Sequence, residues 1–361
     1  MIYINARFFS QKLTGVQRFA INISIALSKL RDDVCFLAPP DITENDTTLK
    51  LKILKIGKRS GPLWEQIDLP LFLKKRSNPL LINLGSTAPI FYKNQIVSHH
   101  DITFIKYPQS FSKSFRAYYS FLVPKMLKKS KLFITVSEFS KKEISGYFNY
   151  PAKKIHVIPN AIDQKFHPAP IKTKNKKKYL LAVSSPNYHK NFERMIEAFF
   201  LADLGDSIEL KIVGSQESNF TRSDLMTKMT DNPGIKFLGH ISDDQLISLY
   251  QNASVFIFPS LYEGFGIPPL EAQACGCPVI SSNRASMPEV LKDSVLYFDP
   301  EDVNAISTLI KVVLNEHKVS ANLIEAGIKN ASRYSWIDSA SKLNNLINDI
   351  NSEESILEGI S

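Results

Sequence analysis

Cysteine is scarce in this chain: its 361 residues include only three, Cys35, Cys275 and Cys277. An odd number of thiols, and no basic and apolar leader in the opening residues MIYINARFFSQ, argue against a secreted scaffold held together by disulfides. We interpret the three as small buried thiols in a reducing compartment. The opening residues are expected to form a first β-strand, and the protein is expected to be cytoplasmic.

Long apolar runs are also missing. The best candidate, residues 111–132, is interrupted by Pro124 and by several lysines, whereas a membrane span needs roughly 20 consecutive apolar residues. The sequence lacks zinc-ligand spacing, an RNP-like aromatic strand and an obvious recognition helix, so we expect no nucleic-acid partner. It shows no cluster of metal ligands either. Any membrane contact is therefore expected to be peripheral, and no metal or other cofactor is expected.

Positive charge is concentrated in the first half of the chain. Residues 1–170 hold 26 Lys and Arg against 11 Asp and Glu, a net of +15, whereas residues 171–361 hold 18 against 24, a net of −6. A basic surface favours an anionic partner, and nucleic acid, anionic lipid head groups and a phosphorylated acceptor all fit that description. Charge alone does not choose among them.

Short β-branched runs alternate with longer amphipathic runs, which is the rhythm of parallel β and α units. The stretch HPAPIKTKNKKK, from His167 to Lys178, has almost nothing apolar to bury and is typical of a linker. We predict an α/β protein with two Rossmann-like domains, residues 1–170 and 171–335, facing each other across a ligand-binding cleft. Residues 336–361 are predicted to include a helix that packs back toward the N-terminal domain. The predicted strands are 1–4, 34–37, 80–84, 95–99, 132–136, 155–158, 179–184, 209–213, 236–238, 255–259 and 279–281.

The most informative stretch is FPSLYEGFGIPPLEAQACGCPV, residues 258–279. A predicted strand ends there, a glycine-bearing loop follows, and two prolines open a helix whose free N–H groups favour a phosphate. Glu271 is expected in the first turn of that helix, eight residues after Glu263. Its carboxylate would accept hydrogen bonds from ribose hydroxyls or interact with the helix dipole. The alternative is a Gly-Pro turn with a capping glutamate.

The two glutamates within EGFGIPPLEAQACGCPVI closely resemble the E-x7-E signature of the retaining glycosyltransferases of family 4, which have the two-domain fold called GT-B. Other blocks resemble that family in the same order: SQKLTGVQRFAINI, VSHHDITF, ITVSEFSKKEI, VIPNAID, LLAVSSPNYHKNFERMIEAF, LKIVG and KFLGHISDDQLISLYQNASVFIFPS. Together they cover nearly the whole chain. The resemblance implies the GT-B fold and an enzyme of the kind that assembles bacterial surface polysaccharides such as O-antigen or capsule.

Carried over by position, the resemblance implies that Glu271 binds the ribose of a nucleotide-sugar donor and that Lys190 neutralises its diphosphate. A cation suits that position because the departing nucleoside diphosphate gains negative charge in the transition state. A solvated lysine at a helix start is the alternative. Many family members have an arginine where this chain has Ser185, so Arg18, His189 or backbone amides are expected to compensate. The predicted donor-binding residues are Gly15, Ser185, Lys190, Gly264, Phe265, Gly266, Ile267 and Glu271.

The catalytic residues implied by the resemblance are His100, Asp101 and Glu263. His100 would follow a strand of the N-terminal domain, where an imidazole can bind sugar hydroxyls or handle a proton near neutral pH. His99 would face the opposite way in a regular strand, and the alternative is that both histidines are structural. No carboxylate pair is laid out as in a double-displacement glycosidase. Retention without a metal is thus implied by the resemblance, with a leaving diphosphate oxygen accepting the acceptor proton.

The predicted reaction is retaining transfer of a hexosyl or deoxyhexosyl group from a nucleotide-diphosphate sugar, GDP-mannose first and a UDP- or dTDP-sugar as alternatives, to a glycan or lipid-linked glycan. Aromatic and cationic residues in 104–132, with Lys74, Lys75 and Arg76, suit an anionic bilayer at the inner face of the cytoplasmic membrane, or else a core with a solvated face. The alternatives are a sugar-nucleotide epimerase or a phosphorylase of the same fold, a non-catalytic sugar-nucleotide-binding protein and a nucleic-acid-binding protein. Sugar transfer to an acceptor separates these from the predicted enzyme.

Overall fold

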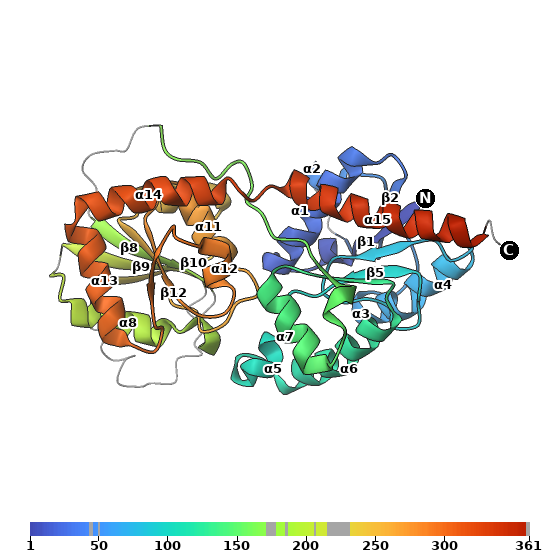
Figure 1. Cartoon of the computed structure of the whole chain (residues 1–361), viewed down its shortest axis with the longest axis horizontal. Coiled ribbons are helices and arrows are strands. Elements are labelled where there is room, and N and C mark those ends of the chain that lie inside the picture. The colour runs from blue at the N-terminus through green and yellow to red at the C-terminus, as the bar shows by residue number, and fades with distance from the viewer. Residues whose placement is uncertain are drawn as a thin grey trace. The chain divides into compact units, whose positions relative to one another are not determined.

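The computed structural model describes residues 1–42, 46–49, 51–170, 178–184, 187–205, 207–214 and 232–358. The chain forms two compact units (Figure 1). The first contains residues 1–102, 113–161 and the segment from 335 onward, and the second contains residues 103–112 and 162–334. Each unit is built on a parallel sheet of its own.

The second unit begins at Ile162, before the boundary predicted at residue 170. The reason is local packing, because the buried ring of Phe166 lies 6.2 Å from that of Tyr250. Lys165 also forms an ion pair with Asp243 at 2.6 Å, and the Gln251 amide donates a hydrogen bond to the carbonyl of His167 at 2.8 Å. These contacts hold the start of the predicted linker to the second unit. Residues 171–177 of that linker lie outside the described ranges.

Seven parallel strands form the sheet of the first unit, in the order β3-β2-β1-β4-β5-β6-β7. Strands β1, β2, β4 and β5 are buried along their whole length, as expected for a parallel sheet covered on both faces. The bounds are β1 Ile2–Asn5, β2 Val34–Ala38, β3 Ile53–Lys55, β4 Leu81–Asn83, β5 Gln95–Ser98, β6 Leu132–Thr135 and β7 Ile155–Val157.

The helices of the first unit include a π-helical segment, Trp64–Asp68, between two short α-helices. The α-helices are α1 Gly15–Leu30, α2 Asp46–Leu49, α3 Gly61–Leu63, α4 Leu69–Lys74, α6 Lys113–Lys129, α7 Glu138–Phe148 and α15 Trp336–Glu358. Two 3-10 segments, Arg7–Ser10 and Ala152–Lys154, follow β1 and precede β7.

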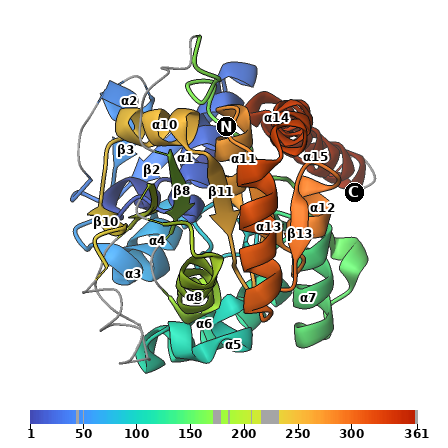
Figure 2. The same ribbon diagram turned by 90° about the vertical axis from the view of Figure 1, so that its left-hand side faces the viewer.

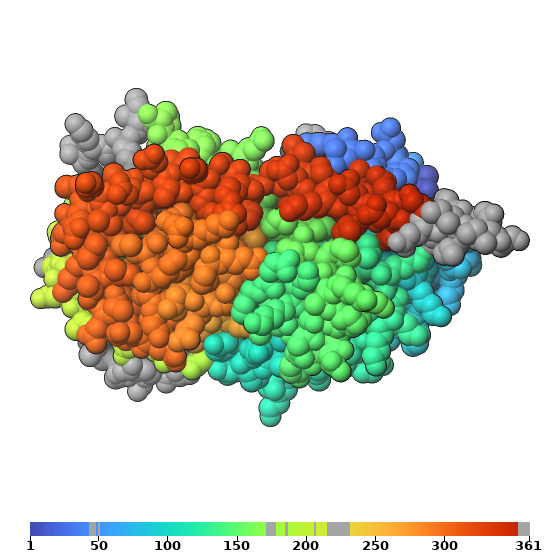
Figure 3. Space-filling model, viewed as in Figure 1, coloured from blue at the N-terminus to red at the C-terminus, as the bar shows by residue number. Residues whose placement is uncertain are grey.

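The C-terminal helix α15 packs along α1 (Figure 1). The ring of Trp336 lies 6.3 Å from that of Phe19, and the Arg31 guanidinium donates to the side-chain oxygens of Asn344 and Asn348 at 2.9 and 2.7 Å. In the space-filling view, the red atoms of α15 form part of the outer surface of the first unit (Figure 3). The segment after residue 335 is therefore part of the fold of the first unit, although the second unit precedes it in sequence.

The second unit has a six-stranded parallel sheet in the order β10-β9-β8-β11-β12-β13. Helices α8 and α13 lie side by side in its core, as Figure 2 shows. The strands are β8 Lys178–Val183, β9 Ile208–Val213, β10 Ile235–Gly239, β11 Val255–Phe258, β12 Val279–Ser282 and β13 Leu296–Phe298. The helices are α5 Thr103–Lys106, α8 Phe192–Ala202, α10 Asp243–Asn252, α11 Ile267–Ala274, α12 Met287–Leu291, α13 Val303–Asn315 and α14 His317–Ala331, with 3-10 turns at Pro108–Ser110 and Tyr188–Lys190.

Both sheets follow the doubly wound order, which reverses beside the first strand of each: between β1 and β4, and between β8 and β11. In such sheets, ligands bind outside the carboxyl ends of the strands at the reversal point. The residues that follow these four strands are therefore the first place to look for a site.

The prediction of two Rossmann-like α/β sheets is confirmed, and all the predicted strands form, with ends shifted by at most a few residues. Strands β3 and β13, each at an edge of its sheet, were not predicted. All three cysteines are buried free thiols. None of the described helices is long and apolar enough to cross a bilayer.

Candidate active site

The glycine-bearing loop between β11 and α11 is closely packed. Gly264, Phe265 and Gly266 are all buried, and Ile267 begins the helix. Gly266 precedes α11 with a φ of +90°, a conformation that disfavours any residue with a side chain. A Cβ there would lie 2.5 Å from the terminal methyl of Met287, which is itself fully buried. Glycine is therefore strongly favoured at this turn, which presents the first N–H groups of α11.

Lys190 and Glu263 are brought together by this loop. The lysine Nζ lies 2.5 Å from Glu263 Oε1, and the two side chains keep 17% and 15% of their surface exposed. Asn191, which follows the lysine in the left-handed region, donates through its amide to the carbonyls of Pro259 and Pro300 at 3.0 and 2.7 Å. The Ser286 hydroxyl fixes the Glu263 backbone by donating to its carbonyl at 2.9 Å. The result is a held, accessible pair of opposite charges at the reversal point of the second sheet.

Glu271 lies in the second turn of α11, and the prediction that placed it in the first turn was wrong. The helix begins at Ile267, one residue before the first proline, so no acidic residue lies in its first turn. Glu271 is only 6% exposed and accepts a hydrogen bond from the Tyr250 hydroxyl at 3.2 Å. Because the dipole effect falls off within the first turn, hydrogen bonding is the better explanation of this carboxylate.

His189 cannot supply the positive charge that Ser185 lacks. It is buried, its Nδ1 lies 2.8 Å from the Ser110 hydroxyl, and its ring stacks on Phe111. Burial, and next the neighbouring Lys190, lowers the pKa of His189 to about 2, so its imidazole is neutral near pH 7. Ser185 itself lies outside the described residues, and Arg18 belongs to α1 of the first unit.

His100 follows β5 at the carboxyl edge of the first sheet and is 9% exposed. Its ring meets that of Phe19 edge-on, with the centroids 4.7 Å apart, whereas His99 faces Tyr119 of α6 at 5.9 Å. The two rings thus contact different helices, as their alternation predicts. Burial lowers the pKa of both histidines, although the adjacent Asp101 acts in the opposite direction. The predicted donor residue Gly15 is the exposed first residue of α1.

A buried polar cluster at the same edge was not predicted. The Glu65 Oε1 atom accepts hydrogen bonds from the Asn5 amide at 2.8 Å and the Thr87 hydroxyl at 2.9 Å, and lies 3.3 Å from Arg7 Nε. The Arg7 guanidinium also donates to Thr87 at 2.6 Å. Asn5 is the last residue of β1, Arg7 lies two residues beyond it and Thr87 lies four residues beyond β4, so the cluster occupies the reversal point of the first sheet. Polar residues at and just beyond the ends of buried strands were the available signal for this cluster.

No group of three or more His, Cys, Asp or Glu in the described part of the chain is placed to hold a metal ion.

Comparison with known proteins identifies the family. A profile described as Glycosyltransferase Family 4 matches residues 13–166, and one described as Glycosyl transferases group 1 matches residues 163–330. The chain is 31% identical over 266 residues to the O-antigen chain mannosyltransferase B of Escherichia coli, which covers 69% of this chain and 70% of that protein. This chain belongs to glycosyltransferase family 4. The predicted family and the predicted enzyme class are thereby confirmed.

This glycosyltransferase is also 32% identical over 246 residues to the O-antigen chain mannosyltransferase RfbU of Salmonella typhimurium, with 68% of this chain and 67% of that protein covered. Its fold matches sucrose-phosphate synthase from Thermosynechococcus elongatus with a TM-score of 0.76, at 18% identity, over 98% of this chain and 99% of that one. It matches Anabaena HepE, solved in complex with UDP and glucose, with a TM-score of 0.72 at 16% identity, over 96% and 99%. These structures establish the GT-B fold.

Proposed function

We propose that this glycosyltransferase transfers a mannosyl group from GDP-mannose to a glycan or lipid-linked glycan acceptor, with retention of configuration and without a metal ion, in bacterial surface polysaccharide synthesis. Two relatives that align over two thirds of their length, from two bacteria, are both named O-antigen mannosyltransferases. HepE was solved with UDP and glucose, so a UDP-sugar is the alternative donor.

The observation that carries this proposal is the pair formed by Lys190 and Glu263 beside the first turn of α11. The Lys190 ammonium would stabilise the leaving diphosphate, whose charge grows as the bond to the sugar breaks. The free N–H groups at the start of α11 would add donors for the same phosphate oxygens. Glu263 would then be released to accept hydrogen bonds from hydroxyls of the transferred sugar.

Three further residues complete the proposed roles. Glu271, held by Tyr250, would accept hydrogen bonds from the donor ribose. His100, neutral near pH 7 because burial lowers its pKa, would bind a hydroxyl of the sugar through Nε2, which is buried and has no hydrogen-bond partner among the described residues. Asp101 would orient this histidine and stabilise any positive charge that it gains. The acceptor proton would pass to the leaving diphosphate oxygen.

A peripheral contact with an anionic membrane is part of the same proposal. Helix α6 buries Leu122, Met126 and Leu127 in the core but leaves the ring of Phe121 56% exposed beneath the Lys125 ammonium, which lies 3.2 Å from the ring centre. Both sequence interpretations therefore apply to this helix: one face is core, and the other presents an aromatic ring and cations. Such a face suits the interface of an anionic bilayer.

The experiment that tests the function measures transfer from GDP-mannose, UDP-glucose and dTDP-rhamnose to lipid-linked glycan acceptors by mass spectrometry, with and without EDTA. We expect transfer from GDP-mannose, no loss with EDTA, and an α-linked product by NMR from the α-linked donor. Transfer from only another donor would overturn the choice of mannose. Hydrolysis or epimerisation with no transfer would overturn the proposed reaction.

The donor site is tested separately by nucleotide binding. Glu271→Ala and Lys190→Ala should each weaken GDP binding about tenfold or more, because each removes a hydrogen bond to or from a charged group. Glu325→Ala, which removes an exposed carboxylate of α14, is the control and should bind GDP as the wild type does. Unchanged GDP affinity in both site variants would remove these two residues from the donor site.

A further inference from the structure

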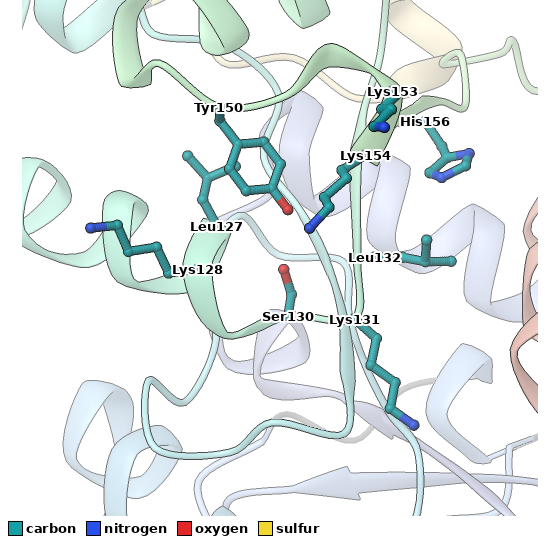
Figure 4. A pocket seen from close by; sticks show the side chains of 9 residues that line it. All are labelled: Leu127, Lys128, Ser130, Lys131, Leu132, Tyr150, Lys153, Lys154 and His156. Carbon is teal, nitrogen blue, oxygen red and sulfur yellow. The ribbon is translucent and has the colours of Figure 1, made fainter. Parts of the chain in front are cut away.

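A cavity of about 410 Å³ opens at the amino ends of β6 and β7 in the first unit. One wall comes from the end of α6, with Lys128, and from its connection to β6, with Ser130 and Lys131. The other comes from the connection between α7 and β7, with Tyr150, Lys153 and Lys154. Figure 4 shows these side chains around the cavity. We call this cavity and its lining residues the lysine pocket.

The lysine pocket carries positive charge without a matching carboxylate. Its lining includes four lysines and no Asp or Glu. The described residues provide no ion-pair partner for Lys128, Lys153 or Lys154. In the second unit, by contrast, Lys165 and Lys190 are each paired with a carboxylate. Like charges held close together raise each other's energy, and an anion in the pocket would relieve this repulsion.

Neutral hydrogen-bond donors accompany the lysines. The Ser130 hydroxyl oxygen is buried and has no hydrogen-bond partner among the described residues. Burial raises the pKa of Tyr150, so its phenol stays protonated near pH 7 and can donate. Figure 4 shows the hydroxyls of Ser130 and Tyr150 and the ammonium of Lys154 pointing toward one another. Two hydroxyl donors beside an ammonium suit the several acceptor oxygens of a phosphate group.

The position of the lysine pocket separates it from the candidate active site. Lys131 directly precedes β6 and Lys154 directly precedes β7, whereas His100 and Asp101 follow β5. Since these strands are parallel, the pocket and the histidines lie at opposite edges of the sheet. A four-residue strand spans roughly 13 Å. A group bound in the pocket is therefore not the group that reacts.

We propose that the lysine pocket is a second anion site, which binds the phosphate or diphosphate group of a ligand away from the reaction. The source of that group is either the head group of an anionic lipid or a soluble phosphate compound. The inference does not depend on which sugar the enzyme transfers, because none of the proposed donor-binding or catalytic residues lines the pocket.

The test uses the full chain with Lys128→Glu and Lys154→Glu combined. The control is Lys74→Glu combined with Lys75→Glu, which makes the same charge change at exposed lysines at the end of α4 in the same unit. Co-sedimentation with phosphatidylglycerol vesicles, compared with phosphatidylcholine vesicles, measures binding to an anionic lipid. Calorimetric titration with inorganic pyrophosphate measures binding to a soluble phosphate compound, in a Lys190→Ala background that weakens binding at the donor site.

We expect the pocket variant to lose more than about tenfold in affinity for at least one probe, while the control stays within about threefold of its parent protein. Loss confined to vesicles identifies a lipid head group, and loss confined to pyrophosphate identifies a soluble ligand. Equal losses in the pocket and control variants would mean that only the overall charge matters, which overturns the proposal. Binding of neither probe to the parent protein would overturn it as well.

Removal of the two neutral hydroxyl donors provides a second test. Ser130→Ala combined with Tyr150→Phe removes both hydroxyls without changing any charge, and we expect about a tenfold loss for the same probe. An unchanged affinity would contradict the part of the proposal that assigns these hydroxyls to the ligand. Stabilisation of either pocket variant by GDP should match the wild type, so a failure here is distinguishable from a failure of the proposed function.

Discussion

The carboxyl edges of the two sheets share one strand order but differ in electrostatics. At the first edge the charges are buried and paired with each other, since Arg7 and Glu65 lie 3.3 Å apart and keep only 10% and 1% of their side-chain surface exposed, and His99 and His100 are buried with lowered pKa values. At the second edge Lys190 and Glu263 form a charged pair that solvent still reaches. Topology thus determines where a ligand binds, whereas the side chains after each strand determine what that edge can do.

This difference matches the two tasks of a sugar transfer. A rigid, nearly neutral edge can hold hydroxyl groups in place, because its groups do not rearrange when charge moves nearby. An accessible charged pair can exchange its internal partner for a diphosphate whose charge grows during the reaction. The predictions that follow test this division of roles between the two units.

The largest effect is expected at His100. His100→Ala should lower turnover by about 10²- to 10³-fold, the range typical of a lost hydrogen-bonding group that positions the transferred sugar in the transition state, while GDP still raises the melting temperature as in the wild type. His317→Ala, which removes an exposed imidazole in the second unit, is the control and should keep full turnover. Turnover by His100→Ala within about twofold of the wild type would assign this histidine a structural role.

Glu65 is expected to give the next largest effect, on stability. Glu65→Ala leaves Arg7 buried without its partner, and we expect a loss of about 3–5 kcal/mol in the free energy of unfolding, measured by urea denaturation. Asp32→Ala removes an exposed carboxylate from the same unit and should change that free energy by no more than about 0.5 kcal/mol. Similar losses of unfolding free energy in the two variants would mean that the buried cluster contributes little to the stability of the first unit.

Gly266 gives a smaller and more specific effect at the second edge. Gly266→Ala should cost about 1–3 kcal/mol, because its φ is positive and its Cβ would collide with the buried Met287 methyl. Gly239→Ala is the matched control: its φ is +65°, but a Cβ there meets nothing within 4 Å. The difference between the two unfolding free energies measures the collision together with the larger φ of Gly266, +90°. We expect Gly266→Ala also to weaken GDP binding. If both variants lost the same free energy of unfolding and Gly266→Ala bound GDP as the wild type does, the proposed role of this tight turn would be contradicted.

The smallest effect concerns His189 and pH. Because burial lowers the folded-state pKa of His189, the unfolded state takes up its proton first as the pH falls below about 6.5, so stability is lost on acidification. His189→Gln should therefore lose about 2–4 °C less in melting temperature than the wild type between about pH 7.5 and about pH 5. His317→Gln makes the same change at an exposed site and should follow the wild-type curve. A parallel loss in all three proteins would mean that His189 is not responsible.

The sequence was informative where the chemistry is local in the chain. The loop from Glu263 to Glu271 carries its turn glycine, its prolines and its carboxylates within one stretch, so its form was predictable, except for the turn in which Glu271 lies. That error came from taking Pro268 as the first helical residue. Lys190 was assigned through resemblance alone, since no periodic pattern links it to Glu263, 73 residues away.

The missed features depend on contacts between distant segments. The Asn5 amide meets Glu65 across 60 residues, and Glu65 lies in a π-helical segment that no simple periodicity predicts. His189 was considered as a compensating cation, but Phe111 and Ser110, from a segment surrounded in sequence by the first unit, bury it and make it neutral. Burial of a titratable group depends on such tertiary contacts, which a single sequence does not reveal.

The packing of α15 against α1 has a consequence for biosynthesis. On the ribosome, the face of α1 that carries Phe19 is made early, but its partner Trp336 emerges only after residues 162–334 have been translated. At typical translation rates of 5–20 residues per second, this delay is on the order of 10–30 s. During that interval an apolar helix face is accessible to chaperones and proteases. A chain that stops anywhere in the second unit therefore leaves this face of the first unit exposed.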